Sequence, residues 1–193
     1  VRRRLRGAFA RAIAGARGGQ GDDRTTTMLK LEERLWRRCF HARIDAERQQ
    51  MRRKGAVVTK GICLGRRWYA KKRFRGEGRA AARRFAAFLA DGTKFYEAQS
   101  KIDRPHHNAA LVSEKSTITD SSPYARRCLT RLGDLARYAD RRVEARAWYL
   151  RARDGPAFNA LGVLAESDGH VATAAFWYAR ADAERCFLND NDA

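Results

Sequence analysis

The sequence predicts an all-α fold, and three observations support this expectation. Only three prolines occur among the 193 residues, and long segments rich in Ala, Arg, Leu and Glu show no sustained alternation of apolar and polar residues. Apolar side chains recur instead at spacings of three, four and seven residues, as on one face of a helix. We therefore expect an antiparallel stack of helices. No run of about 18 apolar residues occurs, so no membrane-spanning helix is expected.

A basic segment covers residues 1–27, and in it Leu5, Phe9 and Ile13 recur every four residues. Such a pattern occurs in basic amphipathic helices that bind membrane surfaces or nucleic acid, and in mitochondrial transit peptides. We favour a helix that packs its apolar side and leaves its arginines in solvent. A second helix is expected over residues 25–54. Its two adjoining apolar lines are Leu31, Leu35 and Cys39, and Trp36, Phe40 and Ile44.

Three basic side chains share one face of this second helix. Arg34, Arg38 and His41 lie at i, i+4 and i+7, and like charges stacked in this way repel by roughly a few tenths of a kcal/mol per pair. A bound anion would relieve the repulsion. The simpler interpretation of such a trio by itself is a solvated basic face.

Residues 52–79 combine basic and aromatic side chains. Charge that neutralises phosphates, next to rings on which bases stack, is typical of single-stranded nucleic-acid binding. A glycine-punctuated loop without this function is the simpler alternative, and we favour it. The candidate nucleic-acid-binding residues are Arg66, Arg67, Trp68, Tyr69, Lys71, Lys72, Arg73 and Phe74.

A third helix is expected over residues 79–102. Gly92 interrupts it at a cost of roughly 1 kcal/mol relative to alanine, which indicates a close approach to another helix. Residues 103–122 form a polar connection, where His106 and His107 lack further ligands at a useful spacing and are interpreted as loop residues rather than a metal site. The apolar stripe of the helix comprises Phe85, Phe88, Leu89 and Phe95 or Tyr96.

The most clearly marked helix covers residues 123–138. Ser122 and the polar residues before it offer N-cap oxygens, and Pro123 suits the first turn, where its missing N–H is no loss. The helix carries Arg137, whose simplest structural role is an ion pair with Asp134 or Asp140. Its apolar stripe comprises Cys128, Leu132, Leu135 and Ala136.

The chain then repeats itself at an offset of 29 residues. The positions that repeat are those of tetratricopeptide repeats, in which small residues let two antiparallel helices approach and aromatic residues fill the space to the next repeat. Because the usual period is about 34 residues, the connection at residues 153–156 is expected to be short. We predict two tetratricopeptide-like helical pairs, covered at one end by the preceding helices. Leu129, Leu132, Gly133, Ala136, Ala145, Tyr149 and Ala152 align with Phe158, Leu161, Gly162, Ala165, Ala174, Tyr178 and Ala181.

The net charge of +19 is unevenly distributed. Residues 1–127 hold 32 basic and 12 acidic residues, a balance of +20, and residues 128–193 hold nine Arg and no Lys against ten Asp and Glu, a balance of −1. Such a basic part attracts nucleic acid, phosphorylated or acidic partners, or anionic membranes. The four cysteines, at positions 39, 63, 128 and 186, form no C-x-x-C pair, and this fits a reduced compartment, the nucleus or the cytoplasm.

Five stretches occur in the order expected of one known family. They are LEERLWRRCF at 31–40, FLADGTKFY at 88–96, CLTRLGDLARY at 128–138, AWY at 147–149 and GPAFNALGVLA at 155–165. The chain resembles the N-terminal 14-3-3-like, tetratricopeptide-containing domain of the SMG and ever-shorter-telomeres proteins. The resemblance covers roughly residues 28–50 and 80–184, and the run at 128–138 is its most distinctive part.

The resemblance implies an all-helical adaptor domain of nonsense-mediated mRNA decay. In that family the domain binds the phosphorylated decay helicase and other decay factors, and some members bind telomerase RNA or single-stranded telomeric DNA. The arginine of the Leu-Ala-Arg-Tyr run, here Arg137, and a lysine on the Leu-Trp helix can form its phosphate pocket. The lysine position holds His41, so Arg38, one turn back, is expected to take its place, with Arg34 on the same face.

Two functions follow as expectations. The first is a phosphopeptide-binding adaptor in the nucleus and cytoplasm, with residues 28–184 as its helical domain and 185–193 as a tail. The second is a telomerase-associated protein that binds telomeric DNA or RNA through its basic segments. An enzyme is not expected, because no Ser, Cys or Asp lies in a recognisable nucleophile motif and no paired metal ligands occur. We expect no cofactor and no membrane partner.

Overall fold

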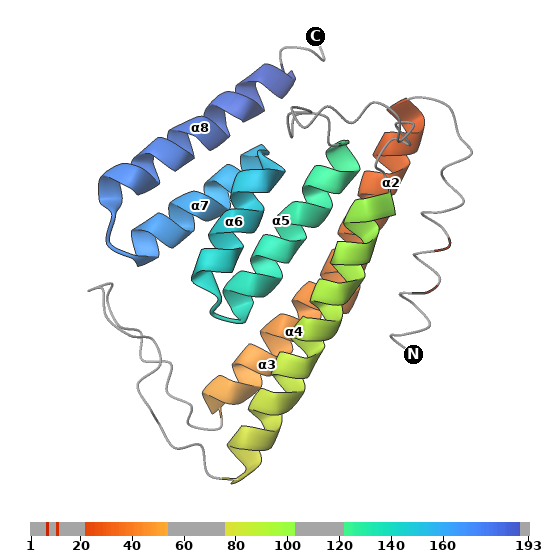
Figure 1. Cartoon of the computed structure of the whole chain (residues 1–193), viewed down its shortest axis with the longest axis vertical. Coiled ribbons are helices and arrows are strands. Elements are labelled where there is room, and N and C mark those ends of the chain that lie inside the picture. Colours follow the sequence, from red (N-terminus) through yellow and green to blue (C-terminus); the bar gives the residue numbers. More distant parts are fainter. Residues whose placement is uncertain (1–6, 8–10, 12–21, 54–75, 103–121, 190–193) are drawn as a thin grey trace, which may run out of the picture. The chain divides into compact units, whose positions relative to one another are not determined.

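The computed structural model of the chain describes residues 22–53, 76–102 and 122–189, together with Gly7 and Arg11. Within these residues the chain is all-α, as predicted, and forms no strand (Figure 1). The described residues fall into two compact units, one of 22–53 with 76–88 and one of 89–102 with 122–189. The helix expected near the N-terminus and most of the predicted connections at 52–79 and 103–122 lie outside the described residues.

The first unit begins with one continuous helix in three parts. These are α2 (Asp22–Leu35), the π-helical segment η2 (Trp36–His41) and α3 (Ala42–Arg53). Leu35 and Ala42 have right-handed helical backbone angles, so the helix runs through the π-helical segment without a break. The predicted helix over 25–54 is therefore confirmed, and the π-helical turn is an addition to it.

Aromatic side chains form the core of the first unit. Trp36 stacks on Phe40 with ring centroids 5.7 Å apart, and the Phe40 ring lies 5.9 Å from that of Phe88. Phe88 belongs to α4 (Gly76–Ile102), which covers the helix predicted over 79–102 and continues into the second unit. The guanidinium of Arg43 lies over the Phe88 ring at 4.7 Å, so the core is closed at its edge by a cation.

Besides the end of α4, the second unit contains four described helices joined by short connections. They are α5 (Pro123–Tyr138), α6 (Arg142–Ala152), α7 (Gly155–Ser167) and α8 (Val171–Asn189), and each packs against the next (Figure 1). Two residues, Arg153 and Asp154, connect α6 to α7, and Arg153 makes this tight turn in the left-handed backbone region with φ of 52°. This explains why the repeat is shorter than usual.

Local side-chain chemistry sets the starts of α5 and α7. The Ser122 hydroxyl accepts the backbone N–H of Ala125 at 3.1 Å, and Pro123 occupies the first turn, as predicted. Asp154 does the same for α7 by accepting the N–H of Ala157 at 2.8 Å. Its carboxylate also accepts the Thr130 hydroxyl at 3.0 Å, so one residue both caps α7 and fastens it to α5.

Two glycine–tyrosine contacts confirm the tetratricopeptide-like repeat. A Cβ atom added at Gly133 would lie 2.4 Å from Cε1 of Tyr149, and one added at Gly162 would lie 2.4 Å from Cε1 of Tyr178. The contacts are equivalent at the 29-residue offset. Only glycine allows the first helix of each pair to lie directly on the tyrosine ring of the second.

Candidate functional site

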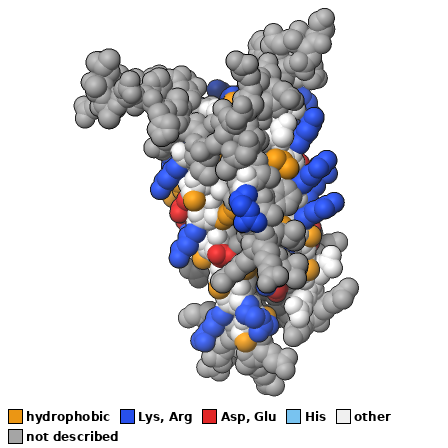
Figure 2. Space-filling model, turned by 90° about the vertical axis from the view of Figure 1, so that its right-hand side faces the viewer, with side chains coloured by type: hydrophobic (Ala, Val, Ile, Leu, Met, Phe, Trp, Pro, Cys, Tyr) orange, Lys and Arg blue, Asp and Glu red, His pale blue; other side chains and the backbone are white. Residues whose placement is uncertain are grey.

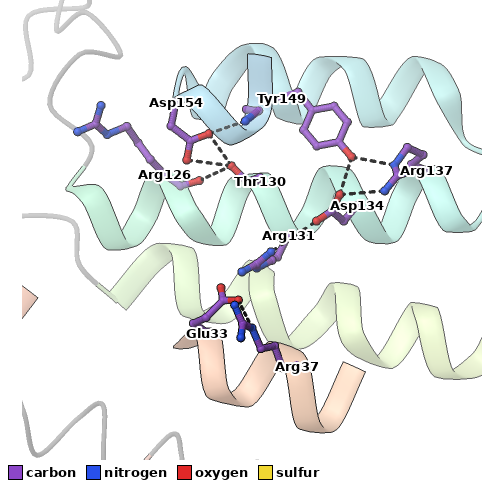
Figure 3. A network of polar contacts seen from close by, with 10 residues as sticks. Glu33, Arg37, Arg126, Thr130, Arg131, Asp134, Arg137, Tyr149 and Asp154 are labelled. Atoms are coloured by element: carbon purple, nitrogen blue, oxygen red, sulfur yellow. Dashed lines mark hydrogen bonds and ion pairs between the residues drawn. The ribbon is translucent and has the colours of Figure 1, made fainter. Parts of the chain in front are cut away.

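The candidate phosphate-binding residue Arg137 is held by side chains from two helices (Figure 3). Its Nη2 donates to Oδ1 of Asp134 at 3.4 Å, and its Nε donates to the Tyr149 hydroxyl at 3.3 Å. The Tyr149 hydroxyl in turn donates to Oδ1 of Asp134 at 2.9 Å. The guanidinium also lies over the ring of Tyr138 at 4.8 Å. Arg137 is thereby fixed at the end of α5.

Exposure differs sharply within this Arg137 cluster. The side chain of Arg137 is 31% exposed, that of Asp134 is 16% exposed, and Tyr149 is fully buried. Arg131, whose side chain is 10% exposed, lies 3.7 Å from the second oxygen of Asp134. Two guanidinium groups therefore share one carboxylate, which leaves a net charge of about +1 with Arg137 as the more accessible cation.

The surroundings keep Arg137 charged. Burial by itself lowers the pKa of Arg137, but the Tyr149 hydroxyl and the Asp134 carboxylate outweigh this effect, and the pKa is raised above its ordinary value. An arginine in this position presents a permanent positive charge rather than a titrating one.

The same cluster predicts a loss of stability at alkaline pH. Burial raises the pKa of the Tyr149 hydroxyl above its ordinary value of 10.0, and the Asp134 carboxylate adds to the shift. The unfolded chain therefore releases this proton at a lower pH than the folded chain does, so the free energy of unfolding should fall as the pH rises above about 10.

Urea unfolding of the wild type and of Tyr149→Phe, at neutral pH and above pH 10, measures this effect. Because other groups also titrate in this range, the informative quantity is the difference between the two proteins. We expect the stability advantage of the wild type to shrink at high pH. A difference that does not change with pH would contradict the prediction.

The predicted basic trio lies along the helix of the first unit. Arg34, Arg38 and His41 are all exposed, and His41 lies 3.2 Å from the carboxylate of Asp45. Neither Arg34 nor Arg38 has a side-chain acceptor within the described part of the chain. Arg38 and His41 belong to the π-helical segment η2, and such segments are frequent at functional sites.

Arg137 and the basic trio belong to different units. The structure brings Arg137 together with Asp134, Tyr149 and Arg131, and it places Arg34, Arg38 and His41 along one helix. A pocket that combines the two sets stays a prediction. Of the two ion pairs suggested for Arg137, the one with Asp134 is confirmed, whereas Asp140 pairs with Arg142 at 3.6 Å.

Asp134 was predicted as an ion-pair partner of Arg137, but Tyr149 and Arg131 were not predicted to take part in the cluster. Tyr149 could have been found, because a tyrosine at the repeat position must place its hydroxyl beyond the glycine contact, and Tyr178 likewise donates to Glu166 at 2.8 Å. Arg131 has no comparable signal in the sequence.

The remaining predictions concern residues of other kinds. The candidate nucleic-acid-binding residues between Arg66 and Phe74 lie outside the described residues.

Cys39 and Cys128 are buried free thiols, as expected of small core residues. No cluster of three metal-ligating side chains occurs in the ranges that the structure describes, and none of their helices is long and apolar enough to cross a membrane.

Comparison with known proteins does not extend this picture. No protein-family model matches the chain, and no solved structure matches it significantly.

Proposed function

We propose that this protein is a non-catalytic adaptor that binds a phosphorylated segment of the decay helicase in nonsense-mediated mRNA decay, in the nucleus and cytoplasm. The observation that carries the proposal is Arg137, a permanently charged and partly exposed guanidinium held in place by Tyr149 and Asp134. The order of motifs in the sequence and the two tetratricopeptide-like pairs support the same function.

A fixed guanidinium suits phosphate because little side-chain entropy is lost on binding. Within the described contacts, Nε and Nη2 of Arg137 are engaged by Tyr149 and Asp134, and Nη1 takes no part. Nη1 is the donor we assign to the phosphate oxygen. The Asp134 carboxylate would repel a dianion, but Arg131 balances its charge.

A single cation of this kind does not account for strong binding of a phosphate dianion. The resemblance seen in the sequence adds Arg38, with Arg34 and His41 beside it, as further phosphate ligands, and this part of the proposal rests on the sequence. Arg34 and Arg38 suit this role because they are exposed and have no carboxylate partner among the residues that the structure describes. Guanidinium groups bind phosphate with two parallel hydrogen bonds, which a lysine cannot do.

The test is a titration of labelled peptides from the decay helicase, phosphorylated and unphosphorylated, with the wild type and Arg137→Glu. We expect the wild type to prefer the phosphorylated peptide and Arg137→Glu to bind it about 10- to 100-fold more weakly, because a charge-assisted hydrogen bond is lost and a repulsive charge introduced. Arg185→Glu is the matched control, since this substitution makes the same change of charge at an exposed side chain of α8. Equal binding in all combinations would contradict the proposal.

Nucleic-acid binding is the second candidate function. Its support is the excess of 32 basic over 12 acidic residues in positions 1–127. On the face shown in Figure 2, Lys and Arg side chains are far more prominent than Asp and Glu side chains among those coloured. This function differs from the first in that affinity for a single-stranded oligonucleotide falls steeply with salt and does not depend on peptide phosphorylation.

A further inference from the structure

Exposed large apolar side chains gather on the second helix of each pair. Val143 and Leu150 lie on α6, and Val171 and Phe176 lie on α8, with exposed fractions of 88% for Val143 and 75% for Val171. Among the described residues, the remaining large apolar side chain that is exposed is Val163, on α7. Exposed apolar side chains that form a contiguous patch mark interaction surfaces, so the face that they occupy on each helix matters.

The helix α6 has two apolar faces. Ala145, Tyr149 and Ala152 are fully buried and form the face toward the core. Val143, Ala147 and Leu150 are exposed and follow one another at i, i+4 and i+7, so they form a second stripe. At about 100° per residue this stripe lies on the side of α6 opposite the buried face. We call it the outer face of α6.

Two arginines flank the outer face of α6, one on each side of the stripe. Arg146 precedes Ala147 on one flank, and Arg151 follows Leu150 on the other. Arg146 is half exposed and reaches Asp168 only at 3.9 Å, while Arg151 lies over the Trp148 ring at 4.7 Å.

The acidic residues of this region are held more closely by other arginines than by the two that flank the stripe. Glu144 pairs with Arg141 at 2.8 Å, and Asp168 is bound by Arg142. The outer face is thus an apolar stripe between two cations.

The stripe and one of its two flanking arginines recur on α8 at the 29-residue offset, where Ala175 takes the place of Arg146. Ala172, Phe176 and Ala179 replace the three stripe residues and are likewise exposed. Arg180 replaces Arg151 and also lies over an aromatic ring, that of Phe158, at 4.7 Å. The recurrence in two helices argues that the outer apolar stripe belongs to the repeat and is not one irregular position.

We infer that the outer face of α6 binds an amphipathic helix of a partner protein whose apolar stripe is flanked by Asp and Glu side chains. Val143 and Leu150 would pack against the partner's apolar residues, and Ala147 between them leaves room for a side chain of the partner. Arg146 and Arg151 would pair with the acidic flanks.

Charge complementarity identifies the occupant as another protein rather than the basic segments of this chain. Residues 1–21 and 54–75 contain no acidic residue, so neither can neutralise Arg146 and Arg151. An anionic membrane would also attract the arginines. The small side chain of Ala147 at the centre of the stripe favours a helix over insertion into lipid, which large aromatic residues serve better.

The proposal is independent of phosphopeptide binding, because it uses α6 residues that do not contact Arg137 in the described contacts. The probe is a labelled amphipathic helical peptide with a leucine stripe flanked by glutamates, and its control has lysines in place of the glutamates. Binding of both to the full chain is measured by fluorescence anisotropy. We expect the glutamate peptide to bind at least about tenfold more tightly than the lysine peptide.

Surface variants make the test specific. Val143→Asp combined with Leu150→Asp should weaken the binding of the glutamate peptide by about tenfold or more. Because both wild-type side chains are exposed, circular dichroism should show that the fold of this variant is unchanged. Arg146→Glu with Arg151→Glu should reverse the preference toward the lysine peptide.

Three results would overturn the proposal. The first is equal binding of the two peptides to the wild type, and the second is unchanged binding of the glutamate peptide to the variant Val143→Asp with Leu150→Asp. The third is that neither peptide binds, while the wild type binds phosphatidylserine vesicles and this variant does not. The last result would assign the outer face of α6 to a membrane surface instead.

Discussion

Replacing Gly133 by valine is expected to lower the free energy of unfolding by about 2–3 kcal/mol, because the new side chain overlaps the ring of Tyr149. That ring cannot move aside easily. It is fully buried, and its hydroxyl is held by both Asp134 and Arg137. Urea unfolding followed by circular dichroism measures the change, and the midpoint should fall without a change in slope.

Gly162→Val is the matched control, since Gly162 makes the same contact with Tyr178. The Tyr178 ring is partly exposed, and its hydroxyl donates only to the exposed Glu166, so the ring can rotate outward. We expect a smaller loss, of about 1 kcal/mol. If Gly162→Val destabilised the protein as much as Gly133→Val, the polar contacts of Tyr149 would not be what holds its ring in place.

Asp134→Ala is the second substitution expected to have a large effect. It removes the carboxylate that lies between Arg131 and Arg137 and accepts the Tyr149 hydroxyl. Because the cluster is largely buried, loss of one partner leaves positive charges close together in a medium of low dielectric constant. We expect the free energy of unfolding to fall by about 3 kcal/mol, as measured by denaturant unfolding.

Asp182→Ala is the control for the loss of an aspartate. Asp182 pairs with Arg185 on α8 at 3.6 Å, and both side chains are largely exposed. The free energy of unfolding should therefore change by less than about 0.5 kcal/mol. The stability lost in Asp134→Asn should lie between the losses in Asp134→Ala and Asp182→Ala, because the amide oxygen of Asn still accepts the Tyr149 hydroxyl. Equal stability of Asp134→Ala and the wild type would show that the cluster does not contribute to the fold.

Much of the fold could be predicted because the relevant chemistry is local or repeated. Ser122 and Pro123 mark the start of α5 through interactions within one turn. The 29-residue offset aligned Gly133 and Tyr149 with Gly162 and Tyr178, and a repeated combination of small and aromatic residues has few structural solutions. The expectation that the aromatic residues fill the space to the next repeat was incomplete, because the structure places Tyr149 against Gly133 of its own helical pair.

Other features could not be predicted, for identifiable physical reasons. The π-helical segment η2 shifts the hydrogen-bond register within a helix and contains the stacked rings of Trp36 and Phe40. The spacing of apolar residues does not reveal such a shift. The bond between Arg137 and Tyr149 crosses from α5 to α6, so it depends on how the two helices face each other. The repeat alignment placed Ala145, Tyr149 and Ala152 at packing positions, but it gave no sign of the exposed apolar stripe on the other side of α6.

The turn at Asp154 also bears on how the protein comes apart. Only Arg153 and Asp154 separate α6 from α7, and the Asp154 carboxylate caps α7 while it accepts the Thr130 hydroxyl of α5. Local melting of α7 and α8 would therefore deprive Thr130 of this acceptor and release the end of α6 at the same moment. The two helical pairs are consequently coupled through this residue, and we expect them to lose structure together rather than as independent modules.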